Sequence, residues 1–275
     1  MRLNIFRGNR LAAACAAFIV VLVVTAIAAP FISPTQTRQL FFAPPKLPPS
    51  WKHPFGTDHM GRDVFRLVVY GSRISLFVGV TATAISLAIG VFLGLVSGYV
   101  GGIVDAVARG LIDLTLAFPS LLLAIAISAV LGPGITTVFL ALSVVGWASF
   151  ARLVRGMVLS LKVREYVAAA ESVGSPARRI ILRHLLPNCM PLVIVAASLK
   201  IGGFILAESA LSFLGLGASP TKLPTWGSMV NLGSDYLRSQ PWISVFPGLA
   251  IAMTVVSFNI VGDALRDRTD PKFRP

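Results

Sequence analysis

Charged residues are scarce in this sequence, and acidic residues are the scarcest of them. Only 13% of the 275 residues are Asp, Glu, Lys or Arg, about half the share found in an ordinary soluble domain. A soluble fold of this length would need more polar surface than these residues supply. With 55% hydrophobic residues and a mean hydropathy of +0.81, the composition predicts an integral membrane protein.

The sequence also lacks the common patterns of catalysis and cofactor binding. Its two cysteines, Cys15 and Cys189, lie in different segments and form no CxxC pair, so neither a disulfide framework nor a zinc site is predicted. It contains no GxxxxGK[ST] phosphate-binding loop, no HExxH motif and no Ser/His/Asp arrangement. We therefore expect no catalytic residue, no metal site and no cofactor in this chain.

The basic excess is the one feature that suggests a nucleic-acid partner. The formal net charge is +13, and basic patches attract phosphates. These charges, however, lie between apolar runs, as in a membrane protein, and they form no basic stripe interleaved with aromatic residues. We expect no nucleic-acid binding.

Long runs without charge define the membrane segments. Residues 11–37, 74–104, 114–151 and 239–262 contain no Asp, Glu, Lys or Arg, and each can cross a bilayer of about 30 Å. Together with turn residues, they predict an all-α polytopic protein with six transmembrane helices. The predicted spans are Leu11–Ile32, Ile74–Val100, Leu114–Leu131, Ile135–Leu153, Pro191–Gly217 and Val245–Val261.

The first apolar run has two interpretations. A secretory signal peptide is one, because Ala26-Ile27-Ala28 resembles a cleavage site. The length of the run and the position of Pro30 favour the other, an uncleaved membrane helix. A Pro-rich loop over 33–56 follows this helix. Together with the helix described next, the two complete an N-terminal region, 1–72, that precedes a transmembrane domain over 73–263 and a cytoplasmic tail over 264–275.

A short polar segment follows the Pro-rich loop. Thr57 or Asp58 is predicted to cap a short helix that ends at Gly71 and lies on the membrane surface. Four nearby side chains could be metal ligands, but their spacing matches no standard motif, and capping with local ion pairs explains them more simply. They are His53, Asp58, His59 and Asp63.

The distribution of basic residues predicts the orientation. If the N-terminus is cytoplasmic, 15 of the 24 Lys and Arg residues fall in inner segments and eight in outer ones, six of these in the long 33–73 loop. The remaining one is Lys200. Because inner loops are the more basic, we expect both termini in the cytoplasm.

The stretch 152–191 is the only sizeable cytoplasmic region predicted. A helix over 164–173 is expected to stop at Gly174, and Ser175-Pro176 to start a second helix that runs to about Leu186. Small alanines, flanked by acidic Glu165 and Glu171, suit this helix–Gly–helix elbow to docking against a partner. A solvated basic connector is the alternative interpretation.

This elbow resembles a known coupling element. Tyr166-Val-Ala-Ala-Ala-Glu-Ser-Val-Gly174 and Arg183-His-Leu-Leu-Pro187-Asn are similar to the EAA loop of ABC importer permeases, which in that family contacts the ATPase subunit. Matching positions are Ala169, Ala170, Gly174, Leu186 and Pro187. Ala168 stands where the family pattern has Glu, and His184 replaces an apolar residue. The resemblance implies a coupling loop within 160–190.

Three further stretches resemble the dipeptide, oligopeptide and nickel permease group. They are Gly56-Thr-Asp-His-Met-Gly-Arg-Asp63, Glu208-Ser-Ala-Leu-Ser-Phe-Leu-Gly-Leu-Gly217 with Pro224-Thr-Trp-Gly227, and Phe258-Asn-Ile-Val-Gly-Asp-Ala-Leu-Arg-Asp267 with Asp270-Pro271. The resemblance implies the type I ABC importer permease fold and the second permease subunit of such a system. It also implies four partners beside membrane lipid: a homologous permease, two ATP-binding subunits that would hold ATP and Mg²⁺, and an extracytoplasmic binding protein.

The substrate stays open at this stage. Dipeptides or oligopeptides are the leading hypothesis, and nickel or a metal chelate is the alternative within the same group. An intramembrane enzyme or a passive channel would belong to a different class. Charges inside a membrane span usually face a bundle interior or a wet cavity, so Lys200 and Glu208 are candidate residues of the translocation path; pairing with a neighbouring helix is the structural alternative.

Overall fold

A computed structural model of the chain describes residues 9–32, 43–217 and 224–269. Within these ranges the structure is helical, and its β-pairing is a single isolated bridge between Thr57 and Asp63. Arg2, Arg7, the beginning of the Pro-rich loop and Asp270-Pro271 lie outside the described residues. The helices are α1 Arg10–Ile32, α2 Val64–Val100, α3 Gly102–Ala117, α4 Ser120–Leu131, α5 Ile135–Lys162, α6 Glu165–Ser172, α7 Ala177–Ile180, a π-helical turn Ile181–Leu185, α8 Leu186–Phe213, α9 Trp226–Ser234 and α10 Trp242–Thr269.

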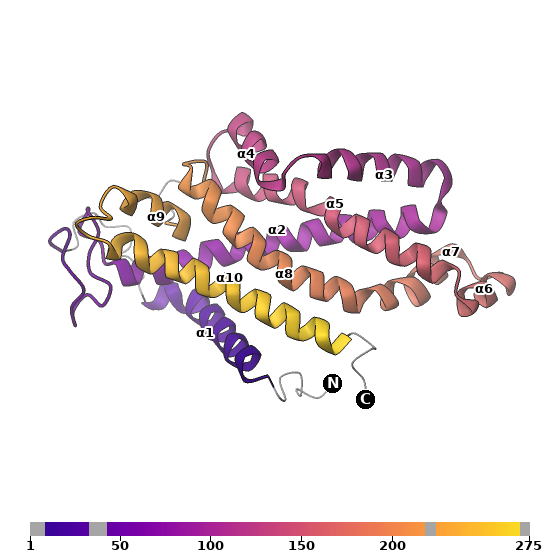
Figure 1. The fold of residues 1–275 in the computed structure, drawn as a ribbon, viewed down its shortest axis with the longest axis horizontal. Helices are drawn as coiled ribbons and strands as arrows, with labels where there is room; N and C mark the ends of the chain where they lie inside the picture. Colours follow the sequence, from indigo (N-terminus) through magenta and orange to yellow (C-terminus); the bar gives the residue numbers. More distant parts are fainter. Residues whose placement is uncertain (1–8, 33–42, 218–223, 270–275) are drawn as a thin grey trace.

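The long helices lie side by side along one axis of the molecule (Figure 1). At one end, here called the loop end, are α9, the 43–63 segment and the turn between α4 and α5. At the other, the elbow end, are α6 and α7. The first turn of α1 and the last turn of α10 point toward the elbow end, so the structure places them on the same side as the predicted cytoplasmic elbow (Figure 1).

Five helices are long and apolar enough to cross a membrane: α1, α2, α5, α10 and the continuous α7–α8 segment. A sixth span exists if α3 and α4, which meet at an angle of 88°, count as one. The all-helical, multi-span architecture predicted from the sequence is confirmed, and six is the upper number of spans among the described residues.

The closest helix pair is α2 against α5. Gly90, Gly94 and Gly98 form a seam on α2 at a four-residue spacing, and α5 backbone and side chains fill the space where their Cβ atoms would lie. A Cβ at Gly94 would be 2.8 Å from the Cβ of Val154, and one at Gly98 would be 2.8 Å from that of Val158. The contacts advance in the same direction on both helices, so α2 and α5 run parallel, and α3 and α4 return the chain between them.

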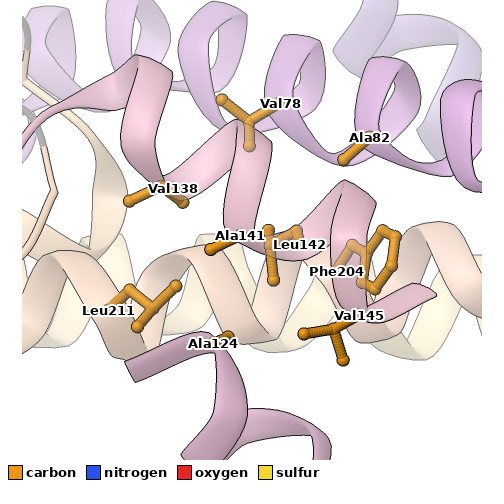
Figure 2. Packing of buried hydrophobic residues seen from close by; sticks show 9 residues of the cluster. All are labelled: Val78, Ala82, Ala124, Val138, Ala141, Leu142, Val145, Phe204 and Leu211. Atoms are coloured by element: carbon orange, nitrogen blue, oxygen red, sulfur yellow. The ribbon is translucent and has the colours of Figure 1, made fainter. Parts of the chain in front are cut away.

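A hydrophobic core joins α2, α4, α5 and α8 (Figure 2). Most of its members are small or β-branched, which lets the helices approach closely. Phe204 of α8 is its one aromatic residue and lies near Val145 and Leu142 of α5. The nine residues are Val78, Ala82, Ala124, Val138, Ala141, Leu142, Val145, Phe204 and Leu211.

The predicted interfacial helix is not a separate element. Helix α2 begins at Val64, capped by Asp63 rather than by Thr57 or Asp58, and continues through Gly71 to Val100. Gly71 does not stop the helix because its role is close packing: a Cβ there would lie 3.1 Å from Cδ1 of Trp226. The second span is therefore the middle and end of one 37-residue helix.

The predicted third span, Leu114–Leu131, is broken. Helix α3 ends at Ala117, and Phe118 is extended (φ −96°, ψ 140°) before Pro119. A residue that precedes proline is disfavoured in the helical region, so the chain bends here by 88°. The charges of α3 lie along α5, where Asp113 pairs with Arg152 at 2.7 Å and Asp105 makes a bidentate pair with Arg155.

The prolines after the elbow do not end a helix. Pro187 occupies the first turns of α8 and Pro191 lies inside it, and the helix continues to Phe213. The π-helical turn at Ile181–Leu185 lies just before Pro187, and local π adjustments re-satisfy backbone groups that a proline leaves without a partner. The second helix of the elbow and the predicted fifth span thus form one continuous helical segment.

Candidate coupling elbow and buried carboxylate

The elbow is anchored to the bundle by a hydrophobic cluster. Val167 of α6, Ile180 of α7 and Leu185 of the π-helical turn are buried against Val154 and Val158 of α5. Burial of one side chain of this size contributes about 1.5–3 kcal/mol relative to leaving it exposed. One face of the elbow is therefore fixed to the helices that precede and follow it.

Polar contacts tie the elbow to the end of α2. The Tyr99 hydroxyl lies 3.3 Å from Oε1 of Glu171, and the ammonium of Lys162 donates to the Tyr99 carbonyl oxygen at 2.7 Å. The amide of Ser175 donates to the carbonyl of Ala170 at 3.1 Å and closes the turn after α6. The elbow thus contacts α2 as well as α5 and α8.

The turn at Gly174 is formed as predicted. Its φ of +74° is left-handed, a conformation that glycine adopts without the steric penalty other residues incur. A Cβ at this position would meet nothing within 4 Å, so the requirement for glycine comes from the backbone alone. Ser175 was predicted to cap the next helix, but Pro176 occupies that position and no side-chain cap is formed.

The predicted coupling residues divide into an exposed and an anchored group. Ala170, Ser175 and Leu186 are half-buried, and Ala170 packs against the anchoring cluster. The others face outward: Glu165, Ala168, Ala169, Glu171, Gly174 and Pro187.

Two exposed valines extend this surface, and the sequence analysis missed them. Val163 and Val173 flank α6, and each is 81% exposed. The sequence signal for them is a pair of valines on either side of a short polar helix. Single exposed apolar side chains are ordinary, but a cluster of them indicates an interaction surface. With Tyr166, which is 41% exposed, they give the elbow an apolar tip.

A basic hollow adjoins the tip. It has a volume of about 530 Å³ and is lined by Arg178, Arg179, Leu182 and Arg183 between Pro176 and Pro187. The elbow therefore offers a partner an apolar tip next to three guanidinium groups, a combination suited to an acidic-rimmed groove.

Glu208 of α8 occupies a buried cage of hydroxyls. Its carboxylate accepts from Ser212 at 2.7 Å and from Ser75 of α2 at 3.1 Å, and Thr225 and Ser209 also hydrogen-bond to it. The side chain is 2% exposed. Buried polar groups are costly unless they are hydrogen-bonded, and sequence spacing could not show that Ser75, 133 residues away, supplies a donor.

Lys200 is placed quite differently. It is half-buried, and its ammonium lies 5.2 Å from the ring centroid of Phe204, within the range of a cation–π contact. Among the described residues it forms no ion pair. The structure therefore does not bring Lys200 and Glu208 together.

The segment before α9 packs beside Glu208. Trp226 is fully buried, and its indole nitrogen donates to the Val68 carbonyl at 2.9 Å. Thr225 forms a capping box with Ser228. A Cβ at Gly227 would lie 2.6 Å from Cα of Ser209. The Pro224-Thr-Trp-Gly227 stretch thus fixes α9 against α2 and α8.

The Gly56–Asp63 stretch forms a compact knob before α2. Asp58 accepts from the amides of Met60 and Arg62 at 2.8 Å and from Nε of Arg62 at 2.7 Å. Asp63 caps α2 and lies 2.8 Å from Nδ1 of His53. A helix cap and local ion pairs thus account for His53, Asp58 and Asp63, but the capping residue is Asp63, and His59 instead stacks on Tyr236 with ring centroids 5.5 Å apart.

Comparison with known proteins identifies the class that this architecture defines. Residues 90–275 match the family described as binding-protein-dependent transport system inner membrane component, and residues 3–49 match the N-terminal transmembrane domain of oligopeptide transport permease C. A solved structure of the MetNI methionine ABC transporter in inward-facing conformations is similar in fold, with a TM-score of 0.56 and 19% identity, and covers 74% of this chain and 97% of that one.

Curated relatives match nearly the whole chain. The dipeptide transport system permease protein DppC of Bacillus subtilis (strain 168) is 44% identical over 269 residues, 98% of this chain and 84% of the relative. The oligopeptide transport system permease protein OppC of the same organism is 41% identical over 98% of this chain and 88% of its own length. The glutathione transport system permease protein GsiD of Escherichia coli O1:K1 / APEC is 43% identical over 98% and 89%.

The chain therefore belongs to the binding-protein-dependent transport system inner membrane component family. It is a multi-pass membrane permease subunit of an ABC importer of the peptide, dipeptide and glutathione type. It is a transport component and not an enzyme, and it works with ATPase and other subunits.

Proposed function

We propose that the importer to which this chain belongs carries small peptides, namely dipeptides or short oligopeptides, across the bacterial inner membrane. The observation that supports this most strongly is the identity of 41–44% over 98% of the chain to permeases named for dipeptides and oligopeptides. The glutathione permease relative extends the substrate class to a small peptide derivative. The extracytoplasmic binding protein would select the peptide, and two ATP-binding subunits would hold ATP and Mg²⁺.

The elbow is proposed as the contact that receives the ATPase movement. Its outer face carries Ala169, Glu165 and the exposed valines, whereas its inner face is buried against α5 and joined by a hydrogen-bonded turn to α8. A displacement of the tip therefore reaches both helices through packed side chains. Because α5 is fitted to α2 along the glycine seam, the three helices would move together and alternate access to the path between this subunit and a homologous permease.

A transport assay on the assembled complex tests the substrate class. The permease pair, ATPases and binding protein are reconstituted in liposomes with ATP inside, and uptake of a labelled dipeptide, a labelled pentapeptide and a nickel chelate is measured. We expect ATP-dependent accumulation of at least one peptide and none of the chelate. Accumulation of the nickel chelate alone would replace the peptide assignment with the metal alternative. ATP-independent flux of any solute would indicate a passive channel.

Lys200 and Glu208 are proposed to contribute to the translocation path. Lys200 supports the proposal because a half-buried cation without an ion-pair partner among the described residues can meet a peptide carboxylate. For Glu208 the hydroxyl cage adds a second role, which is to hold α8 to α2 and to the start of α9. The two roles are separated by the variants described in the Discussion.

A further inference from the structure

Arg73 is the last charged residue of α2 and stands at the start of its long apolar stretch. It lies in the third turn of the helix, it is exposed, and the described residues offer it no hydrogen bond or ion pair. Charges on a membrane helix are costly without a partner. A guanidinium at this depth reaches the headgroup layer by snorkelling, where lipid phosphates are the available anions.

Two apolar grooves run along α2, and Arg73 lines one of them. The first, between α1 and α2, has a volume of about 330 Å³ and is lined by Arg73 itself together with Val23, Ala26, Ile27, Leu76, Phe77, Val80 and Thr81. The second, between α2 and α5, has a volume of about 370 Å³ and is lined by Phe77, Val78, Thr81, Ala84, Ile85, Ile135, Thr136 and Phe139. Phe77 and Thr81 line both and therefore form the ridge between them.

The geometry points to a phospholipid site: we propose that one glycerophospholipid binds here with its phosphate on Arg73 and one acyl chain in each groove, on either side of Phe77. Phe77 lies one helical turn beyond Arg73, in the direction that leads from the loop end toward the middle of the bundle. The α2–α5 groove continues that way to Ile85 and the α1–α2 groove to Thr81, as acyl chains extend from the headgroup toward the bilayer centre.

The chemistry of Arg73 and of the two grooves favours a phospholipid as the occupant. A guanidinium matches a phosphate diester through two parallel hydrogen bonds, a geometry that an ammonium does not provide. The walls of both grooves are almost entirely apolar apart from Thr81, Thr136 and Arg73, so they suit hydrocarbon and not a peptide backbone. A single cation above paired apolar grooves is complementary to a double-chain lipid with one phosphate.

Lipid binding to the assembled complex tests the proposal. The complex is delipidated in detergent and titrated with dioleoylphosphatidylglycerol, with native mass spectrometry as the readout; dioleoylglycerol, which has the same chains without the phosphate, is the parallel probe. We expect one tightly held phosphatidylglycerol, binding of dioleoylglycerol weaker by about tenfold or more, and no displacement by millimolar inorganic phosphate.

Two variants and a matched control locate the site. Arg73→Gln removes the charge and Ala84→Trp fills the second groove, and each should weaken phosphatidylglycerol binding by about tenfold. Ala88→Trp is the control, because Ala88 is exposed one turn further along α2 and lines neither groove. Unchanged binding in both variants would overturn the proposal, as would displacement by inorganic phosphate. Crosslinking of a cysteine at Thr81 to the homologous permease would assign the grooves to a subunit interface instead.

Discussion

At the scale of single residues, the two charged side chains of α8 differ in surroundings and should differ in effect. Lys200 lies over an aromatic ring without an ion-pair partner among the described residues, and Glu208 is enclosed by hydroxyls. Removing the Lys200 charge therefore breaks no ion pair with a described carboxylate. Losing the carboxylate leaves buried hydroxyl donors without an acceptor, and each unsatisfied group costs about 1–3 kcal/mol.

For Lys200 we predict an effect on transport alone. Lys200→Met keeps the length of the side chain and removes its charge, so the complex should assemble and hydrolyse ATP normally. The KM for peptide uptake should rise several-fold because a carboxylate contact is lost. Uptake with an unchanged KM would show that Lys200 does not meet the substrate.

For Glu208 we predict different outcomes for two substitutions. Glu208→Leu should lower the thermal stability of the complex, because the hydroxyls of Ser75 and Ser212 lose their acceptor. Glu208→Gln retains an oxygen acceptor and should assemble, with reduced transport if charge at this position serves the path. Thermal unfolding and uptake are measured on the same preparations. Normal values of both for Glu208→Gln would end the path assignment and leave only the structural role.

At the scale of elements, the elbow yields the sharpest test of coupling. Ala169→Trp places a bulky side chain on the exposed face of α6, where it should overpack a fitted partner groove, and Gly174→Val forces a β-branched residue into a left-handed backbone at a cost of about 1–3 kcal/mol. We expect membrane insertion to persist and uptake to be lost in both, with the ATPases either released or hydrolysing ATP without transport.

A control outside the elbow separates docking from general disruption. Ala106→Trp introduces the same bulk at an exposed position of α3 and should retain more uptake than Ala169→Trp. Uptake and ATPase retention are measured for all three variants. Normal uptake with either Ala169→Trp or Gly174→Val would make the elbow a solvated connector.

The same scale shows what the sequence could and could not predict. Apolar runs predicted the spans, and Gly174 predicted the stop of α6, because both depend on local chemistry. Gly71 was misread as a stop, since only the distant Trp226 reveals it as a packing position. The bend at Phe118 was overlooked although Pro119 is a local signal. The hydroxyl cage of Glu208 requires residues from three parts of the chain, so no local pattern could indicate it.

At the scale of the whole molecule, the arrangement of the ends predicts topology. The start of α1 and the end of α10 point toward the elbow end of the bundle (Figure 1), and the basic bias of the sequence predicts that this end faces the cytoplasm. Reporter fusions after Arg10, within 43–56, within 160–185 and after Arg268 should read inside, outside, inside and inside. An outside signal from 160–185 would remove the elbow from the reach of ATPases and contradict the coupling proposal.

The length of α2 has a mechanical consequence. A helix of 37 residues is about 55 Å long, whereas the hydrocarbon core of a bilayer is about 30 Å thick. Even when tilted, such a rod projects beyond the hydrocarbon, so its first turns and its last turns lie in different aqueous layers. Its capped beginning follows the Gly56–Asp63 knob, and its end contacts Glu171 of the elbow through Tyr99. One unbroken helix therefore connects the loop end rigidly to the elbow, so a displacement at either end is transmitted along the whole bundle.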